Sequence, residues 1–316
     1  MRWKKDCGMS GDTLGFEGQS VIVTGAGNGL GRVYALELAR RGAAIVVNDL
    51  GVSNDGSGAG GRVAEKVVAE IEALGGRAVP SFDSVATPEG GRAIVELAIK
   101  SFGQVDAVVA NAGILRDKSY YKMELAEFEA VLDVHLRGAY FTTQPAFRAM
   151  KDRGQGGRIV FTASPVALFG TFGQPNYVAA KLGVVGLTTS VAIEGARAQI
   201  FANCIAPMAA TRLTPGMATE TSEEHPFAPR RVAPLVAYLC HRDCPSNGHV
   251  YMAGHNFHAR AAMMLGSGWV ARDEDELTAE AVAAHWAQID DMDGAKALGT
   301  AAEIGAMLKA SVPFLG

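Results

Sequence analysis

The chain has 316 residues, of which 48% are hydrophobic and 20% are charged, as expected for a globular protein with a sizeable core. The net charge is −4 and no basic stripe is visible, so nucleic acid is not expected as a partner. No long apolar run or secretion signal is visible, so we expect a cytoplasmic protein that does not span a membrane.

Short apolar runs alternate with segments of helical periodicity from residue 20 to about residue 206. The predicted strands are 20–24, 44–49, 78–82, 105–111, 157–163 and 201–205. The predicted helices are 31–41, 63–74, 89–102, about 125–153, and 177–198. Continuous apolar strands separated by helices indicate the α/β class, here a Rossmann-type, doubly wound parallel sheet with helices on both faces.

The domain organisation follows from where this alternation stops. We predict an N-terminal extension over 1–16, the Rossmann domain over 17–255 with a further strand at 249–253, and a C-terminal extension over 256–316. The extension carries an amphipathic helix at about 278–289, whose apolar side needs cover from the domain or from a dimer partner.

Two irregular segments interrupt the domain. Residues 51–61 form a loop rich in Gly, Ser, Asn and Asp, which we expect to be mobile. Residues 208–231 contain three prolines and follow the end of a strand, which favours a lid over the substrate; a plain surface connection is the alternative.

The four cysteines lack the spacing of a metal site, so no metal is predicted.

A glycine-rich turn follows the first predicted strand. The residues TGAGNGLG place glycines 25, 29 and 31 where the strand passes into a helix. Such glycines permit a tight turn and let backbone N–H groups approach a pyrophosphate at the helix N-terminus. We therefore predict a dinucleotide site formed by Gly25, Asn28, Gly29, Leu30 and Gly31.

Asp49 ends the second predicted strand. An acid at this place can accept hydrogen bonds from the adenosine ribose and would repel a 2′-phosphate, so NAD is favoured over NADP. Arg32 follows the last glycine of the turn and is expected to point along its helix. Further candidate cofactor contacts follow the third and fourth strands: Asp83, Ser84, Asn111, Ala112 and Gly113.

Tyr177 and Lys181 lie one helical turn apart, and Ser164 follows the fifth strand. Tyrosine has an ordinary pKa of about 10. A lysine ammonium on the same helix face favours the phenolate, which could then take the proton of an alcohol during hydride transfer. Ser164 would hold the substrate oxygen, and Lys181 would also hold the nicotinamide ribose. Taken without Ser164, Tyr177 and Lys181 could also be two ordinary residues on one face of a helix.

Further segments extend this pattern: VNDLG at 47–51, NAGILRD at 111–117, VHLRG at 134–138, FGQ and NY with AAKLG within 172–183, AIEG at 192–195, and TAEAV with Trp286 in the tail. On these residues the chain resembles the short-chain dehydrogenases/reductases from residue 18 to about 253. Among them it is most similar to the (3R)-hydroxyacyl-CoA dehydrogenase domain of peroxisomal multifunctional enzyme type 2 (17β-hydroxysteroid dehydrogenase type 4-like).

The resemblance implies an NAD-dependent homodimer or homotetramer that oxidises the 3-hydroxyl of acyl-CoA esters or, in some members, the 17β-hydroxyl of steroids. It also implies a separate enoyl-CoA hydratase acting upstream, because the sequence has no hydratase domain. His135 stands where the family has an asparagine that holds a proton-relay water; a buried core histidine is the alternative. Pro207 and Thr211, after the sixth strand, are further candidate cofactor contacts.

We predict an NAD-dependent oxidoreductase that converts a (3R)-3-hydroxyacyl-CoA to its ketone, with Ser164, Tyr177, Lys181 and His135 as catalytic residues. The candidate bases for the CoA phosphates are Arg116, Lys118, Lys122, Arg230 and Arg231. The alternatives are a dehydrogenase for a 17β-hydroxysteroid or another bulky alcohol, and a non-catalytic NAD-binding scaffold. An intact serine, tyrosine and lysine argue against the scaffold.

Overall fold

The chain divides into two compact units, Met1–Arg260 and Ala261–Gly316. The computed structural model describes residues 14–53, 55–57, 62–210, 225–271 and 276–304. The narrower domain limits expected from the sequence, 17–255, stay a prediction. The expected lid over 208–231 lies largely outside the described residues.

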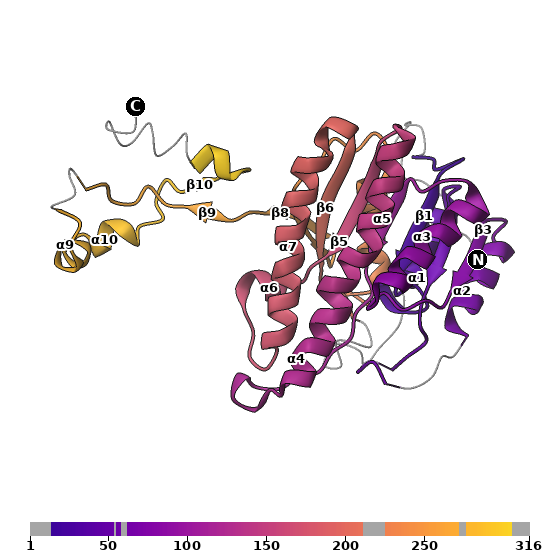
Figure 1. The fold of residues 1–316 in the computed structure, drawn as a ribbon, viewed down its shortest axis with the longest axis horizontal. Coiled ribbons are helices and arrows are strands. Elements are labelled where there is room, and N and C mark those ends of the chain that lie inside the picture. Colours follow the sequence, from indigo (N-terminus) through magenta and orange to yellow (C-terminus); the bar gives the residue numbers. More distant parts are fainter. Residues whose placement is uncertain (1–13, 54, 58–61, 211–224, 272–275, 305–316) are drawn as a thin grey trace. The chain divides into compact units, whose positions relative to one another are not determined.

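An eight-stranded sheet forms the centre of the first unit (Figure 1). Its strand order is β3-β2-β1-β4-β5-β6-β7-β8, and the neighbours from β3 to β7 pair in parallel. The strands are β1 Ser20–Thr24, β2 Ala44–Asn48, β3 Arg77–Ser81, β4 Ala107–Ala110, β5 Gly157–Thr162, β6 Ile200–Pro207, β7 Val250–Gly254 and β8 Phe257–Ala261. The predicted doubly wound parallel sheet is confirmed.

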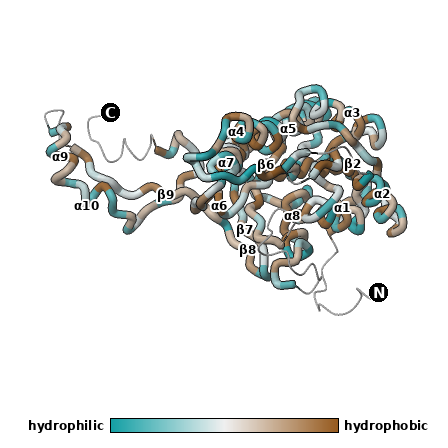
Figure 2. Tube along the Cα trace, turned by 90° about the horizontal axis from the view of Figure 1, so that it is seen from below, coloured by the Kyte–Doolittle hydropathy of each residue, from teal (hydrophilic) through white to brown (hydrophobic). Residues whose placement is uncertain are grey.

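Helices cover both faces of the sheet, and the hydrophobic strands lie between them (Figure 2). Helices α1, α2 and α8 pack on one face, and α3, α5 and α7 pack on the other. Their bounds are α1 Gly29–Arg40, α2 Val63–Ala73, α3 Pro88–Phe102, α5 Gly138–Arg153, α7 Pro175–Gly195 and α8 Ala233–Cys240. Because both faces are covered, every residue of β1, β2, β4 and β5 is buried, which explains their unbroken apolar runs.

The single helix predicted over 125–153 has an irregular turn within it. Helix α4 (Leu125–Leu132) passes into α5 through a π-helical turn over Asp133–Arg137. Such a turn accommodates one extra residue and is frequent at functional sites. It carries His135, whose side chain is buried.

Three parts of the chain differ from the sequence-based expectation. Helix α8 was not predicted; it has only eight residues, and most of them are buried, so it lacks a polar face that would reveal its period. The short helix α6 (Pro165–Phe169) was also missed. In the second unit, the helix predicted at about 278–289 is broken at His285 into α9 (Ala279–Ala284) and α10 (Trp286–Ile289).

The second unit also contains a small antiparallel pair, β9 (Met264–Leu265) with β10 (Lys296–Ala297). In α9 the hydroxyl of Thr278 accepts a hydrogen bond from the Ala281 N–H, which caps the helix start.

One helix among the described residues, Pro175–Ala198, is long and apolar enough to cross a membrane by length and composition alone. It comprises α7 and the 3₁₀ turn that follows. A core helix of a globular domain has the same composition, and α7 packs on β5 and β6. The sequence did not single it out because Lys181 and other polar residues interrupt the apolar run.

Candidate active site

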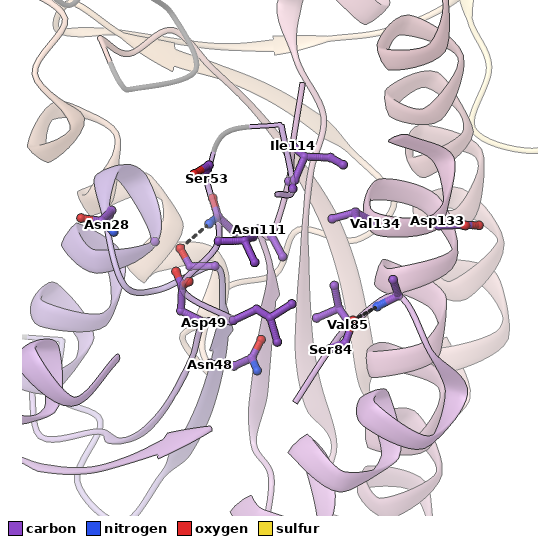
Figure 3. Close-up of a pocket in the computed structure, with 18 of the residues that line it drawn as sticks. Asn28, Asn48, Asp49, Ser53, Ser84, Val85, Asn111, Ile114, Asp133 and Val134 are labelled. Carbon is purple, nitrogen blue, oxygen red and sulfur yellow. Dashed lines mark hydrogen bonds between the residues drawn. The ribbon is translucent and has the colours of Figure 1, made fainter. Parts of the chain in front are cut away.

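A cavity of about 390 Å³ lies at the carboxyl ends of the central strands (Figure 3). This is where the sheet order reverses: the chain runs from β1 outward to β2 and β3, then returns to β4 on the other side of β1. Ligands of such sheets bind at this switch point. The predicted cofactor residues that line the cavity are Gly25, Asn28, Gly29, Leu30, Gly31, Asp49, Asp83, Ser84, Asn111, Ala112 and Gly113. Pro207 does not line it, and Thr211 lies outside the described residues.

The glycine-rich turn is closed tightly against the end of β4. Gly25 has a left-handed φ of +63°, and a Cβ there would lie 2.8 Å from the Cα of Ala112. A Cβ on Gly31 would lie 2.2 Å from the carbonyl oxygen of Gly25. Helix α1 begins directly after this turn, and its N-cap residue Asn28 makes no side-chain capping bond. Free backbone N–H groups at the edge of the cavity fit the pyrophosphate of a dinucleotide.

The carboxylate of Asp49 is held between two backbone segments. Its Oδ2 accepts a hydrogen bond of 2.8 Å from the Gly27 N–H, and its Oδ1 accepts one of 2.7 Å from the Gly51 N–H. Each carboxylate oxygen can accept more than one bond, so the group can still receive ribose hydroxyls. Asp49 therefore places a fixed negative charge at the cavity wall (Figure 3).

Arg32 is turned away from the cavity and is paired with an acid. Its Nε donates to Glu70 of α2 at 3.1 Å, and its Nη2 donates to the second oxygen of the same carboxylate. Arg32 does not line the cavity. The base nearest the glycine turn in sequence is therefore not placed to bind a 2′-phosphate.

Two asparagines join neighbouring strands at the cavity. The Asn111 N–H donates to the hydroxyl of Thr24 at 3.0 Å, and its side-chain amide donates to the Thr24 carbonyl at 3.0 Å. The side-chain amide of Asn48 donates to the hydroxyl of Ser81 and the carbonyl of Asp83. These bonds hold the ends of β1 with β4, and of β2 with β3, in register.

The loop after β2 contributes to the cavity, which the sequence did not predict. The Nε of Arg116 donates to the carbonyl of Asp55 at 3.0 Å, and a Cβ on Gly56 would lie 3.1 Å from Ile114. No local signal links this loop to a segment some sixty residues later. Arg116, which the sequence offered as a candidate base for the CoA phosphates, also lines the cavity. The lining residues that the sequence missed are Asn48, Leu50, Val52, Ser53, Gly56, Val85, Ala86, Ile114, Ala130, Asp133 and Val134.

The fold brings Ser164, Tyr177 and Lys181 together, as their spacing predicts. Ser164 lies just beyond β5 as the N-cap of α6, and its side chain forms a hydrogen bond with Tyr177. The Lys181 Nζ donates to the carbonyl of Thr162 at 2.5 Å and lies 5.7 Å from the centre of the Tyr177 ring. Tyr177 and Lys181 do not line the cavity that the cofactor residues form.

Burial is the largest effect on the pKa values of Tyr177 and Lys181. Burial raises the pKa of Tyr177; the hydrogen bond from Ser164 lowers that pKa, and the charge of Asp117 raises it. Desolvation of the phenol is the largest effect on this pKa, and the lowering expected from Lys181 is not among its causes. Burial also lowers the pKa of Lys181, to about 8.

His135 is buried beside the tyrosine. Its Nε2 lies 2.8 Å from the carbonyl oxygen and 3.1 Å from the amide nitrogen of Ile114. Its ring meets that of Tyr177 edge-on, with centroids 5.1 Å apart. Burial, with the charge of Lys181, holds the pKa of His135 well below its ordinary value, so the ring is neutral. Its buried Nδ1 has no hydrogen-bond partner among the described residues.

Of the candidate bases for CoA phosphates, several already have partners. Lys118 pairs with Glu127, and the Nε of Arg231 donates to the carbonyl of His225. Arg116 binds the carbonyl of Asp55, and Arg230 also has an interaction partner. Lys122 lies exposed on the 3₁₀ turn Tyr120–Lys122.

The comparison with known proteins agrees with this geometry. The family model of the short chain dehydrogenases matches residues 19–225. The short-chain type dehydrogenase/reductase Rv0148 of Mycobacterium tuberculosis is 47% identical over 285 residues, which are 90% of this chain and 98% of the relative. The hydroxyacyl-CoA dehydrogenase ChsB1 of the same organism is 37% identical over 257 residues, 76% of this chain and 78% of the relative.

The peroxisomal multifunctional enzyme type 2 of Drosophila melanogaster is 45% identical over 297 residues, 93% of this chain. The match spans about half of that longer enzyme, 49% of its length. The solved full-length structure of this fly enzyme aligns with a TM-score of 0.78 over 96% of this chain and 51% of that one, at 36% identity.

Proposed function

The chain belongs to the short-chain dehydrogenase/reductase family, and from this premise we propose that it oxidises a (3R)-3-hydroxyacyl-CoA to the 3-ketoacyl-CoA with NAD. Family membership makes it an oxidoreductase that acts on alcohols with a nicotinamide dinucleotide. The juxtaposition of Ser164, Tyr177 and Lys181 beside the dinucleotide cavity is the observation that carries the proposal.

The proposed preference for NAD over NADP follows from the negative charge of Asp49. The Asp49 carboxylate is fixed at the cavity wall by two backbone N–H groups. A 2′-phosphate at the adenosine ribose would meet this negative charge, whereas ribose hydroxyls can donate to it. Arg32, which could offset the repulsion, is paired with Glu70.

Ser164, Tyr177 and Lys181 each have a separate role in the proposed oxidation of the alcohol. A bound NAD, held in the cavity by the glycine turn and Asp49, would supply the acceptor for the hydride of the carbinol carbon. Tyr177 accepts the hydroxyl proton as general base, and its hydrogen bond with Ser164 stabilises the phenolate form. The Ser164 hydroxyl also orients the substrate oxygen. Lys181, held by the Thr162 carbonyl, supplies a positive charge beside the phenol.

His135 is proposed to hold the water through which the proton leaves. Its Nε2 can donate to the Ile114 carbonyl, and in that tautomer the bare Nδ1 needs a donor. A water molecule could donate a hydrogen bond to this Nδ1 and could carry a proton away from Lys181. Lys181 is close enough for its charge to lower the pKa of His135. An asparagine amide can hold a water in the same way, so the replacement preserves the hydrogen-bonding capacity.

Relatives support the acyl-CoA substrate. The names of ChsB1 and of the fly enzyme connect this sequence type with hydroxyacyl-CoA oxidation and with a multifunctional peroxisomal enzyme. A hydroxyacyl-CoA arises when water adds to an enoyl-CoA, so a hydratase must supply the substrate. Among the candidate bases, the exposed Lys122 is proposed to meet the CoA phosphates.

The test compares initial rates of NAD reduction with a (3R)-3-hydroxyacyl-CoA and with a 17β-hydroxysteroid, for the wild type and Tyr177→Phe. We expect oxidation of the acyl-CoA by the wild type and a loss of at least about 100-fold in the variant. Turnover of the steroid alone would contradict the acyl-CoA assignment. Tight NAD binding without turnover of either alcohol would favour a non-catalytic scaffold.

A further inference from the structure

Asn176 stands directly before Tyr177, and the chemistry above does not use it. Its side chain is 0% exposed. The Nδ2 donates to the carbonyl of Arg116 at 2.9 Å and to that of Glu127 at 3.2 Å, while the Oδ1 accepts from the Tyr177 N–H at 2.8 Å. One buried amide therefore joins the segment after β4, helix α4 and the start of α7.

The bond from the Tyr177 N–H to Asn176 satisfies a backbone donor in the first turn of α7. The first N–H groups of a helix have no partner within it. Gln174 is the N-cap of α7 and makes no capping bond, and Pro175 has no N–H to satisfy. The N–H of Val178 is bonded to the Gln174 carbonyl. Tyr177 therefore depends on the Asn176 side chain for its backbone partner.

The other two bonds reach the wall of the cofactor cavity. Arg116 and Ile114 line that cavity. The backbone of Ile114 is held by His135, and the backbone of Arg116 is held by Asn176. The neighbouring Gln174 side chain also binds this segment, through Asp117 at 2.8 Å.

We infer that Asn176 is a positioning residue, which sets the location of the Tyr177 phenol relative to the cavity wall against which the hydride acceptor binds. The inference rests on the proposed function for its kinetic consequence. A displacement of about 1 Å between reacting groups can cost about 100-fold in rate, so loss of the amide should lower turnover more than it lowers binding.

The test uses Asn176→Ala with Asn247→Ala as matched control. Asn247 accepts from the Ala202 N–H and donates to the Ala192 carbonyl, both at 2.9 Å, and so ties down the opposite end of α7. We expect Asn176→Ala to lower kcat for the hydroxyacyl-CoA by about tenfold or more, with KM and the Kd for NADH within about threefold. Asn247→Ala should keep kcat within about twofold while losing thermal stability.

A kcat for Asn176→Ala within about twofold of wild type, or an equal fall in both variants, would overturn the inference. Should Asn176→Ala not fold, Asn176→Ser serves instead, because it removes the two bonds donated by the amide without placing a charge in this buried site, and the same fall in kcat is expected.

A second measurement needs no substrate. The pKa of the Tyr177 phenol is obtained by ultraviolet difference titration against Tyr177→Phe. We expect Asn176→Ala to raise this pKa, because a displaced phenol loses the hydrogen bond with Ser164 that lowers it. An unchanged pKa would contradict a positioning role. A wild type that is silent on hydroxyacyl-CoA would instead contradict only the proposed substrate.

Discussion

The pKa of Tyr177 depends on a residue outside the proposed catalytic group of Ser164, Tyr177 and Lys181. Asp117, in the segment after β4, raises the pKa of the phenol by its negative charge. In the oxidative direction the tyrosine must be unprotonated to accept a proton, so the rate should rise with pH through this pKa. Charges that shift the pKa should therefore shift the pH profile.

Asp117→Asn should lower the pKa of Tyr177, because the repulsion of the phenolate is removed. The rising limb of kcat/KM for alcohol oxidation should then move to lower pH. Steady-state rates across the alkaline range measure this, with wild type as reference. A limb that stays in place or moves to higher pH would contradict the electrostatic role of Asp117.

Lys181 should be a source of instability in the cofactor-free protein. Its folded-state pKa of about 8 lies below the ordinary 10.5, so a protonated lysine is disfavoured by burial. The unfolded chain binds this proton more tightly, and stability should therefore rise with pH between about 8 and 10.5.

Lys181→Met should increase the free energy of unfolding at neutral pH by about 1–3 kcal/mol and flatten that rise, while turnover falls at least about 100-fold. Urea denaturation at several pH values and initial rates measure both effects. A variant that is destabilised at neutral pH would show that the bond to the Thr162 carbonyl outweighs the burial of the charge.

Asp49 should control the choice of coenzyme. Asp49→Ser removes the negative charge from the cavity wall and keeps a small hydrogen-bonding side chain. We expect the ratio of kcat/KM for NADP to that for NAD to rise by about tenfold or more. The control is Asp83→Ser, which lies at the same edge of the cavity after β3 and should change the ratio less.

Residue spacing predicted the serine, tyrosine and lysine because short motifs carry their chemistry within one helix turn or one strand end. The contacts that Arg116 and Asn176 make in the folded chain could not be predicted in this way. Their contacts with Asp55 and Glu127 join segments far apart in the chain, and no local pattern records such a contact.

At the scale of elements, the π turn between α4 and α5 presses His135 against the end of β4. A Cβ on Gly113 would lie 2.2 Å from the Cε1 of this ring. The sequence predicted one helix here, because a single extra residue barely alters the apolar pattern. The close approach of ring and glycine therefore emerges only in the folded chain.

Gly113→Ala should destabilise the protein by about 1–3 kcal/mol and lower activity, because the methyl group must displace His135. Gly186→Ala is the control: nothing lies within 4 Å of a Cβ there, and alanine is the better helix former inside α7. Thermal denaturation of both variants measures the difference. Equal stability of the two would contradict the tight packing of His135 on Gly113.

At the scale of the whole molecule, the parallel sheet was predictable because both of its faces are covered and the central residues of its strands are apolar. The motifs predict the order of the site along the chain, with a dinucleotide turn after β1 and Ser164, Tyr177 and Lys181 after β5 as the proposed proton-transferring group. The second unit was harder to predict, since its short helices and strands have few residues to display a period.

The most direct test of the central claim is the kcat/KM of the wild type for (3R)-3-hydroxyacyl-CoA oxidation, measured with NAD and with NADP. We predict turnover with NAD and a preference over NADP of at least about tenfold, as the fixed charge of Asp49 requires. Equal or better rates with NADP, or no oxidation of this substrate while another alcohol is turned over, would contradict the account.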